Sequence, residues 1–223
     1  MQEKYGTLFI VATPIGNLKD ITLRALDTLK AVHLIACEDT RHTKILLNHY
    51  GIKTPLTSYF EYNKITKGDY LIKVLQEGKN IALVSDAGTP GISDPGSHII
   101  RLALKNAVPL CVIPGPAACI GGLILSGKPT DKFIFEGFLP SKQTARKNRL
   151  KQLTGEKRTI IFYESPHRLL KTLADIYEVF GDVELALIRE LTKLFEEQRR
   201  ECVSSLLAHF VKTKPRGEFI LIL

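Results

Sequence analysis

Residues 84–96 read VSDAGTPGISDPG. This stretch directly follows Ile81–Val84, an apolar run with the length and composition of a buried strand. Three Gly and two Pro within Ser85–Gly96 predict a sharply bent loop whose backbone a ligand can approach closely. Asp86 and Asp94 could hold a hydroxyl or an amine of that ligand. An ordinary long turn, with Asp94 capping the next helix, explains the same residues.

Strand-like runs recur on both sides of this loop, at Leu8–Ala12, Leu34–Cys37 and Leu110–Ile113, and helix-length segments separate them. Strands that alternate with helices predict a parallel sheet. Open parallel sheets place their ligand sites in the loops that follow the strands. The sequence therefore predicts further ligand loops at Thr13–Asn17 and Pro114–Ala118.

A boundary is predicted at Ser126–Asp131, where Gly127 and Pro129 interrupt the pattern. We therefore expect two α/β domains, residues 1–126 and 131–223. The second should contain a helix with Ser165 as its N-cap and Gly181 as its stop. Its predicted strands are Phe133–Phe135, Thr159–Tyr163, Glu184–Ile188 and Phe219–Leu223.

The composition of the 223 residues, 44% hydrophobic and 24% charged, excludes a disordered chain. No apolar run approaches the ~20 residues that span a bilayer. The apolar stretch near the N-terminus is only strand-length, so we expect no secretory signal and a cytoplasmic protein. Neither the four cysteines nor the six histidines have metal-ligand spacing, so no metal site is expected.

Positive charge is concentrated in one stretch. Ser141–Arg158 contains seven Lys and Arg residues against Glu156 alone, a net +6 of the chain's +8. A run of one sign favours contact with a polyanion such as nucleic acid over a solvated helix face, although both fit. The residues that we expect to contact such a nucleic acid are Lys142, Arg146, Lys147, Arg149 and Lys151.

Two further segments carry candidate chemistry. Glu38–Arg41 follows a predicted strand and brings two carboxylates and a guanidinium to the expected ligand edge, where they could orient or deprotonate a hydroxyl. A plain helix start with Asp39 or Thr40 as its cap is the alternative. In the segment Ser58–Asn63, the rings of Tyr59, Phe60 and Tyr62 could stack on unpaired bases or belong to the core.

These segments together resemble the ribose 2′-O-methyltransferases of the tetrapyrrole methylase superfamily that act on small-subunit ribosomal RNA. The motifs that carry the resemblance are Val11–Leu18, Glu38–Arg41, Val84–Gly96, Pro114–Ala117, Phe135–Pro140, Phe162–Arg168, Arg189–Lys193 and Gly217–Glu218. The resemblance covers residues 6–223.

The resemblance implies two α/β domains, the first with a mainly parallel sheet and the second with a mixed sheet, with S-adenosylmethionine (AdoMet) in the cleft between them. It also implies a homodimer that methylates the ribose 2′-hydroxyl of a cytidine in ribosomal RNA. The cofactor contacts that it implies are Pro14, Asp86, Gly88, Thr89, Ile92, Ala117, Ala118, Phe162, Tyr163 and Glu218.

For the proton of the ribose hydroxyl, we expect Asp39 to act as general base with Glu38 and Arg41 in support, and Glu190 with Lys193 as the reserve pair. Two other functions fit the sequence. One is AdoMet-dependent methylation of a tetrapyrrole or corrinoid, and the other is a non-catalytic RNA-binding protein with a vestigial cofactor pocket.

Overall fold

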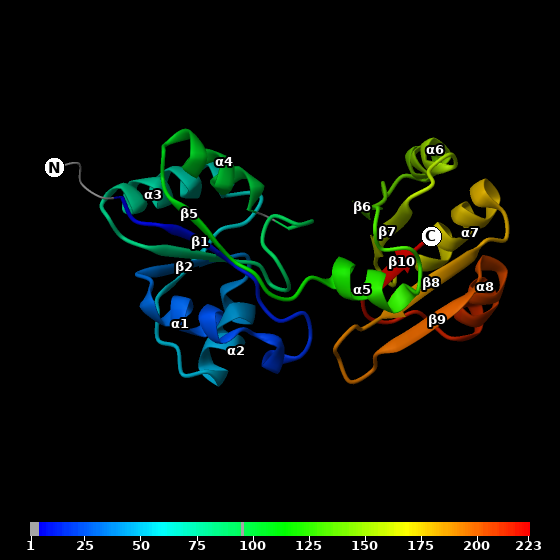
Figure 1. Ribbon diagram of the computed structural model, residues 1–223, viewed down its shortest axis with the longest axis horizontal. Helices are drawn as coiled ribbons and strands as arrows, with labels where there is room; N and C mark the ends of the chain where they lie inside the picture. Colours follow the sequence, from blue (N-terminus) through cyan, green and yellow to red (C-terminus); the bar gives the residue numbers. More distant parts are fainter. Residues whose placement is uncertain (1–4, 95) are drawn as a thin grey trace. The chain divides into compact units, whose positions relative to one another are not determined.

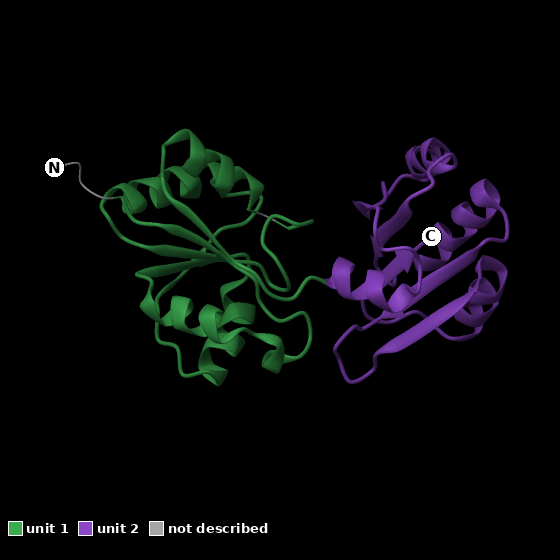
Figure 2. Cartoon of the chain, in the orientation of Figure 1, with its two compact units in different colours: residues 1–117 green, residues 118–223 purple. Residues whose placement is uncertain are grey.

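The computed structural model describes residues 5–94 and 96–223, so Pro95 of the second predicted loop lies outside the described residues. The chain divides into two compact units, residues 1–117 and 118–223 (Figures 1 and 2). The division precedes the predicted linker because helix α5 (Ala118–Ser126) packs on the sheet of the second unit. Arg200 of that unit also donates hydrogen bonds to the Leu125 and Ser126 carbonyls.

The first unit has a five-stranded sheet in the order β3-β2-β4-β1-β5. Every pairing in it is parallel, which confirms the predicted sheet and places the carboxyl ends of all the strands along one edge. The strands are β1 (Leu8–Val11), β2 (Leu34–Cys37), β3 (Leu56–Ser58), β4 (Ile81–Val84) and β5 (Leu110–Ile113).

Helices cover both faces of this sheet (Figure 1). Helices α1 (Leu23–Ala31) and α2 (Thr40–His49) pack on one face, and α3 (Lys64–Gln76) and α4 (Ser97–Lys105) pack on the other. The short 3-10 helix η1 (Leu18–Asp20) precedes α1. Thr22 caps α1, since its hydroxyl accepts the Ala25 N–H at 3.1 Å.

The second unit has a mixed sheet in the order β6-β7-β10-β8-β9, in which only β6 and β7 are parallel. Helices α6 (Gln143–Leu153), α7 (Leu169–Phe180) and α8 (Val203–Lys212) contribute side chains to a single core on one face. Its strands are β6 (Phe133–Phe138), β7 (Thr159–Glu164), β8 (Glu184–Arg189), β9 (Glu197–Cys202) and β10 (Phe219–Ile222).

Helix α5 lies against the other face of this sheet. The two are so close that a Cβ added at Gly122 of the helix would lie 2.9 Å from Cγ2 of Ile220 on β10. The predicted end of α7 at Gly181 is confirmed, but the predicted N-cap Ser165 is wrong, because the helix begins at Leu169 with Arg168 in the cap position. Residues 166–168 form a turn before it. None of the described helices is long and apolar enough to cross a membrane.

Candidate functional site

Four predicted segments meet at the carboxyl edge of the first sheet. Thr13 and Gly88 exchange backbone hydrogen bonds of 2.9 and 3.1 Å, which join the loops after β1 and β4. The Thr89 hydroxyl donates to the Pro116 carbonyl at 3.2 Å and ties in the loop after β5. The loop after β2 is joined through the Asp39 N–H, which donates to Asp86 Oδ1 at 3.1 Å.

Gly88 sits at the centre of this assembly with φ +82°, a conformation that side-chain-bearing residues rarely adopt. A Cβ added there would lie 3.4 Å from Cγ2 of Ile15 and 3.7 Å from the Pro116 carbonyl oxygen. Thr13 braces the same point, since its buried hydroxyl donates to the Ser85 carbonyl at 3.1 Å. Thr13 lies in a predicted ligand loop but was not among the predicted cofactor contacts, and its place close after β1 is the signal that could have found it.

The other predicted cofactor residues of the first unit differ in exposure. Asp86, Thr89 and Ala117 are half-buried, and Ile92 is 45% exposed although it is apolar. Pro14 is buried beside the Thr13–Gly88 bridge. Together they offer one carboxylate, one hydroxyl, backbone groups and an apolar side chain, a set that suits a nucleoside better than a metal ion.

In the second unit, the Tyr163 hydroxyl accepts the Cys119 N–H at 2.9 Å, next to Ala118 at the start of α5. The Tyr163 ring packs edge-on against Phe135, with 4.8 Å between centroids. Phe162 points to the opposite side of the strand and is fully buried in the apolar core, so its ring is not accessible to a ligand.

Among the acidic residues of the first unit, Asp39 is the N-cap of α2. This is the plain helix start that the sequence offered as the alternative to a catalytic role. Its carboxylate accepts hydrogen bonds from the Arg41 side chain at 2.7 and 3.1 Å and from the Arg41 N–H at 2.8 Å. These bonds lower the pKa of Asp39 to about 2, which makes it a weak base. Burial, with the Asp86 and Asp39 carboxylates nearby, instead raises the pKa of Glu38. The environment therefore favours Glu38 over Asp39 as proton acceptor.

The reserve pair forms a second charged cluster, in the second unit. Lys193 Nζ donates to Glu190 Oε1 and Glu218 Oε2, both at 2.8 Å. Burial acts to raise the pKa of Glu190, but bonds from Lys193 and the Glu218 amide hold it below its ordinary value. Glu190 and Thr192 both have positive φ, so this loop is held in a conformation that is costly for residues other than glycine.

The predicted RNA contact at Arg146 is wrong. Its side chain and that of Asp175 on α7 are each 2% exposed, and Arg146 Nε donates to Asp175 Oδ2 at 2.6 Å. The guanidinium also donates to the Ser141 carbonyl at 3.1 Å. Arg146 joins α6 to α7 and cannot reach a phosphate.

The rest of the basic stretch divides into paired and free cations. Lys147 pairs with Glu178 at 2.6 Å, and Arg149 forms a two-pronged pair with Glu136. Lys142, Lys151 and Lys157 are exposed, and none of them pairs with an acidic residue in the part of the chain that the structure describes.

The aromatic segment also divides. Tyr59 is buried in the core with its hydroxyl 3.3 Å from His98 Nδ1, whereas Tyr62 is 96% exposed. Phe60 packs edge-on against Tyr62, with 6.4 Å between the ring centroids. Of the three rings, Tyr62 is thus the one free to stack on a base.

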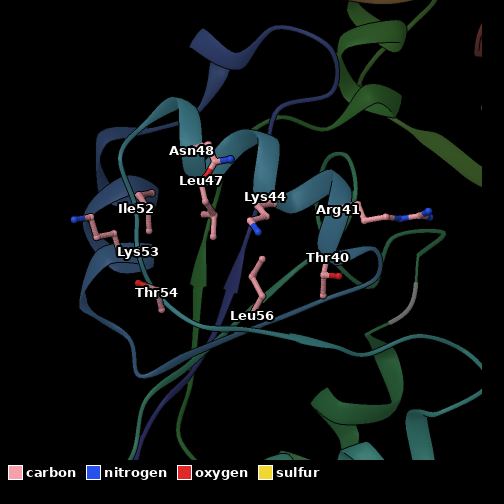
Figure 3. A pocket seen from close by; sticks show the side chains of 9 residues that line it. All are labelled: Thr40, Arg41, Lys44, Leu47, Asn48, Ile52, Lys53, Thr54 and Leu56. Carbon is pink, nitrogen blue, oxygen red and sulfur yellow. The ribbon is translucent and has the colours of Figure 1, made fainter.

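A cavity of about 530 Å³ lies between α2 and the edge strand β3 (Figure 3). The cavity was not predicted; only its lack of acidic lining could have been foreseen, since Thr40–Phe60 contains no Asp or Glu. The residues that line it are Thr40, Arg41, Lys44, Leu47, Asn48, Ile52, Lys53, Thr54 and Leu56. Among the residues that the structure describes, no group of three or more His, Cys, Asp or Glu side chains could hold a metal ion.

Known proteins resemble this chain along nearly its whole length. A family model for tetrapyrrole (corrin/porphyrin) methylases matches residues 7–206. A protein of Thermotoga maritima called "Ribosomal RNA small subunit methyltransferase I" is 50% identical over 98% of both chains. A protein with the same name from Escherichia coli O157:H7 is 50% identical over 97% of this chain and 77% of its own.

Solved structures share the fold at low sequence identity. A diphthine synthase superposes with a TM-score of 0.77 at 14% identity, covering 98% of this chain and 90% of its own. A uroporphyrin-III-C-methyltransferase from Thermus thermophilus superposes with a TM-score of 0.65 at 19% identity, covering 97% and 94%.

Proposed function

The chain belongs to the tetrapyrrole (corrin/porphyrin) methylases, and from this we propose that it transfers a methyl group from AdoMet to the 2′-hydroxyl of a cytidine ribose in small-subunit ribosomal RNA. One observation carries the proposal: relatives about 50% identical over almost the whole chain carry the name of a small-subunit ribosomal RNA methyltransferase. We further propose that the protein acts in the cytoplasm as a homodimer.

The residues present fit AdoMet. Gly88 leaves room for a ligand against the loop backbone, because it has no side chain and its φ of +82° disfavours any residue that has one. The Asp86 carboxylate has one bond from the Asp39 amide and keeps acceptor capacity for ribose hydroxyls or an amine. Bound AdoMet supplies an activated methyl group, so the task of the protein is alignment of the acceptor and removal of its proton.

Glu38 is the residue that we propose for the proton. It directly follows β2 at the edge where the four loops meet, and its raised pKa makes it a better base than Asp39. The Asp39–Arg41 pair caps α2 and so fixes the backbone next to Glu38.

Incubation of the chain with small ribosomal subunits and AdoMet carrying a labelled methyl group tests the function. We expect label in one ribose of the RNA, at a cytidine, after nuclease digestion and mapping. Absence of label in RNA, together with label in an added uroporphyrinogen or precorrin, would replace this function with tetrapyrrole methylation. AdoMet binding without transfer to either substrate would support a vestigial cofactor pocket.

AdoMet binding should not depend on a metal ion, because the described residues offer no cluster of metal ligands. Calorimetric titration with AdoMet should give the same affinity with and without EDTA. An affinity that falls in EDTA and returns with a divalent cation would contradict this prediction.

A further inference from the structure

The cavity between α2 and β3 is unusual in its charge. Arg41, Lys44 and Lys53 line it, and none of its lining residues is acidic. Figure 3 shows Lys44 between the helix and the strand, with Arg41 and Lys53 extending in opposite directions. Such a concentration of one sign creates a positive potential in a partly enclosed space.

The cations of the cavity are available to a partner. Lys44 and Lys53 are exposed, and neither pairs with an acidic residue within the described ranges 5–94 and 96–223. Arg41 is 90% exposed, and its pair with Asp39 lies at the surface, where solvent and salt screen the attraction. A phosphate at Arg41 would compete with the Asp39 carboxylate, so Lys44 and Lys53 are the cations that a phosphate can reach without displacing another partner.

Residues that line the cavity are spread along a helix, which suits a chain rather than a compact anion. Helix α2 has ten residues and is therefore ~15 Å long. Three of the lining residues, Thr40, Lys44 and Asn48, recur every four residues along one side of this helix. The cations are spread along this length and do not converge on one point. A linear polymer of regularly spaced negative charges matches that arrangement.

The cavity also begins beside the proposed proton acceptor. Thr40 and Arg41, which line it, follow Glu38 within three residues. A single strand of RNA lying along α2 would thus pass close to the carboxyl edge of the sheet, where the four loops meet. Tyr62, which follows β3 and is almost fully exposed, adds an aromatic ring on which an unpaired base can stack.

We propose that this cavity, the α2–β3 groove, binds the sugar-phosphate backbone of the RNA substrate next to the ribose that is methylated. The inference rests on the proposed function and gives the first unit its own RNA contact, separate from the lysines of the second unit. The phosphate contacts would be made by Lys44 and Lys53, with Arg41 at the end nearest Glu38.

The test replaces Lys44 and Lys53 by Gln together and measures binding of a fluorescein-labelled single-stranded RNA across a salt series. The log–log salt slope should become shallower by about 0.7 for each lysine that contacts a phosphate. Methylation of small subunits should show a higher KM for the subunits at an unchanged AdoMet affinity. Lys73→Gln/Lys105→Gln, on the helices α3 and α4 of the opposite face, removes the same charge and should retain the original slope.

An unchanged salt slope of RNA binding and an unchanged KM for the subunits in the Lys44/Lys53 variant would overturn the inference. So would a variant that is monomeric where the unaltered chain is a dimer, because a second copy of the chain would then be the occupant of the α2–β3 groove. Lysine acetylation of the unaltered chain provides a check that needs no variant. RNA should slow acetylation of Lys44 and Lys53 but not of Lys73 and Lys105, and equal rates would also overturn it. If the unaltered chain transfers no methyl group to small subunits, the proposed function fails first.

Discussion

At the scale of single residues, Gly88 is the most constrained position of the site. Valine there would require a backbone conformation with φ near +82° and would crowd Ile15. We expect Gly88→Val to lower the free energy of unfolding by about 1–3 kcal/mol and to weaken AdoMet binding at least tenfold. Denaturant unfolding and calorimetry measure the two effects.

Gly181→Val is the matched control, because Gly181 has φ +79° but nothing within 4 Å of an added Cβ. It should destabilise the fold to a similar extent and leave AdoMet affinity unchanged. If Gly88→Val also retains its affinity, the loop is a structural turn only.

Glu38 and Asp39 differ in the pH at which each loses its charge. The raised pKa of Glu38 means that it takes up a proton first as the pH falls, whereas Asp39, with a pKa of about 2, stays ionised. The methylation rate should therefore fall on the acidic side as Glu38 becomes protonated. Glu38→Gln should lower kcat by about 10²- to 10⁴-fold and abolish that acidic limb.

Asp39→Asn serves as the comparison, since it keeps the shape of the helix cap and should retain the acidic limb of the pH–rate profile. If Glu38→Gln keeps the acidic limb of the profile and Asp39→Asn loses it, Asp39 is the base. The sequence could place both carboxylates at the ligand edge, but not rank them, because their pKa values depend on hydrogen bonds and burial in the folded state.

At the scale of helices and strands, the buried Arg146–Asp175 pair joins α6 to α7. Arg146→Met should lower the free energy of unfolding by up to about 3–5 kcal/mol, because the buried Asp175 carboxylate loses its shortest ionic contact and keeps only the Gln143 amide at 3.1 Å and Lys147 Nζ at 3.8 Å. Arg146→Met/Asp175→Leu should recover most of that loss, and Lys142→Met should change little. Urea unfolding of the three variants measures these differences, and an Arg146→Met protein of normal stability would contradict the structure.

Local sequence could not reveal that pair, since Asp175 lies 29 residues beyond Arg146 in the chain. Strands β1, β2, β4 and β5 of the first unit were predictable, because each is a continuous run of apolar residues of strand length. Two edge strands were not. β3 has only three residues, and β9 reads EQRREC, so its pairing with β8 rests on backbone hydrogen bonds rather than on an apolar pattern.

At the scale of the whole molecule, the net charge of +8 favours association with RNA, but only unpaired cations should affect it strongly. Replacing Lys142, Lys151 and Lys157 by Gln should weaken the salt dependence of subunit binding. The slope of log affinity against log salt concentration should become shallower by up to about 0.7–0.9 for each of these lysines that binds a phosphate. Replacing Lys147, which is paired with Glu178, should have a smaller effect. A larger effect at Lys147 than at the three exposed lysines would contradict this division.

The two sheets also differ in when their middle strands are made. β4, the middle strand of the first sheet, is complete at residue 84, and that sheet has all its strands once residue 113 exists. The second sheet has β10 at its centre, between β7 and β8, and cannot close before residue 222. At roughly 5–20 residues per second, the ribosome takes about 5–20 s to add the intervening residues. β7 is complete at residue 164 and β8 at residue 189, so both apolar strands are made before β10, the strand that lies between them, and each keeps an unpaired edge until the last residues are added.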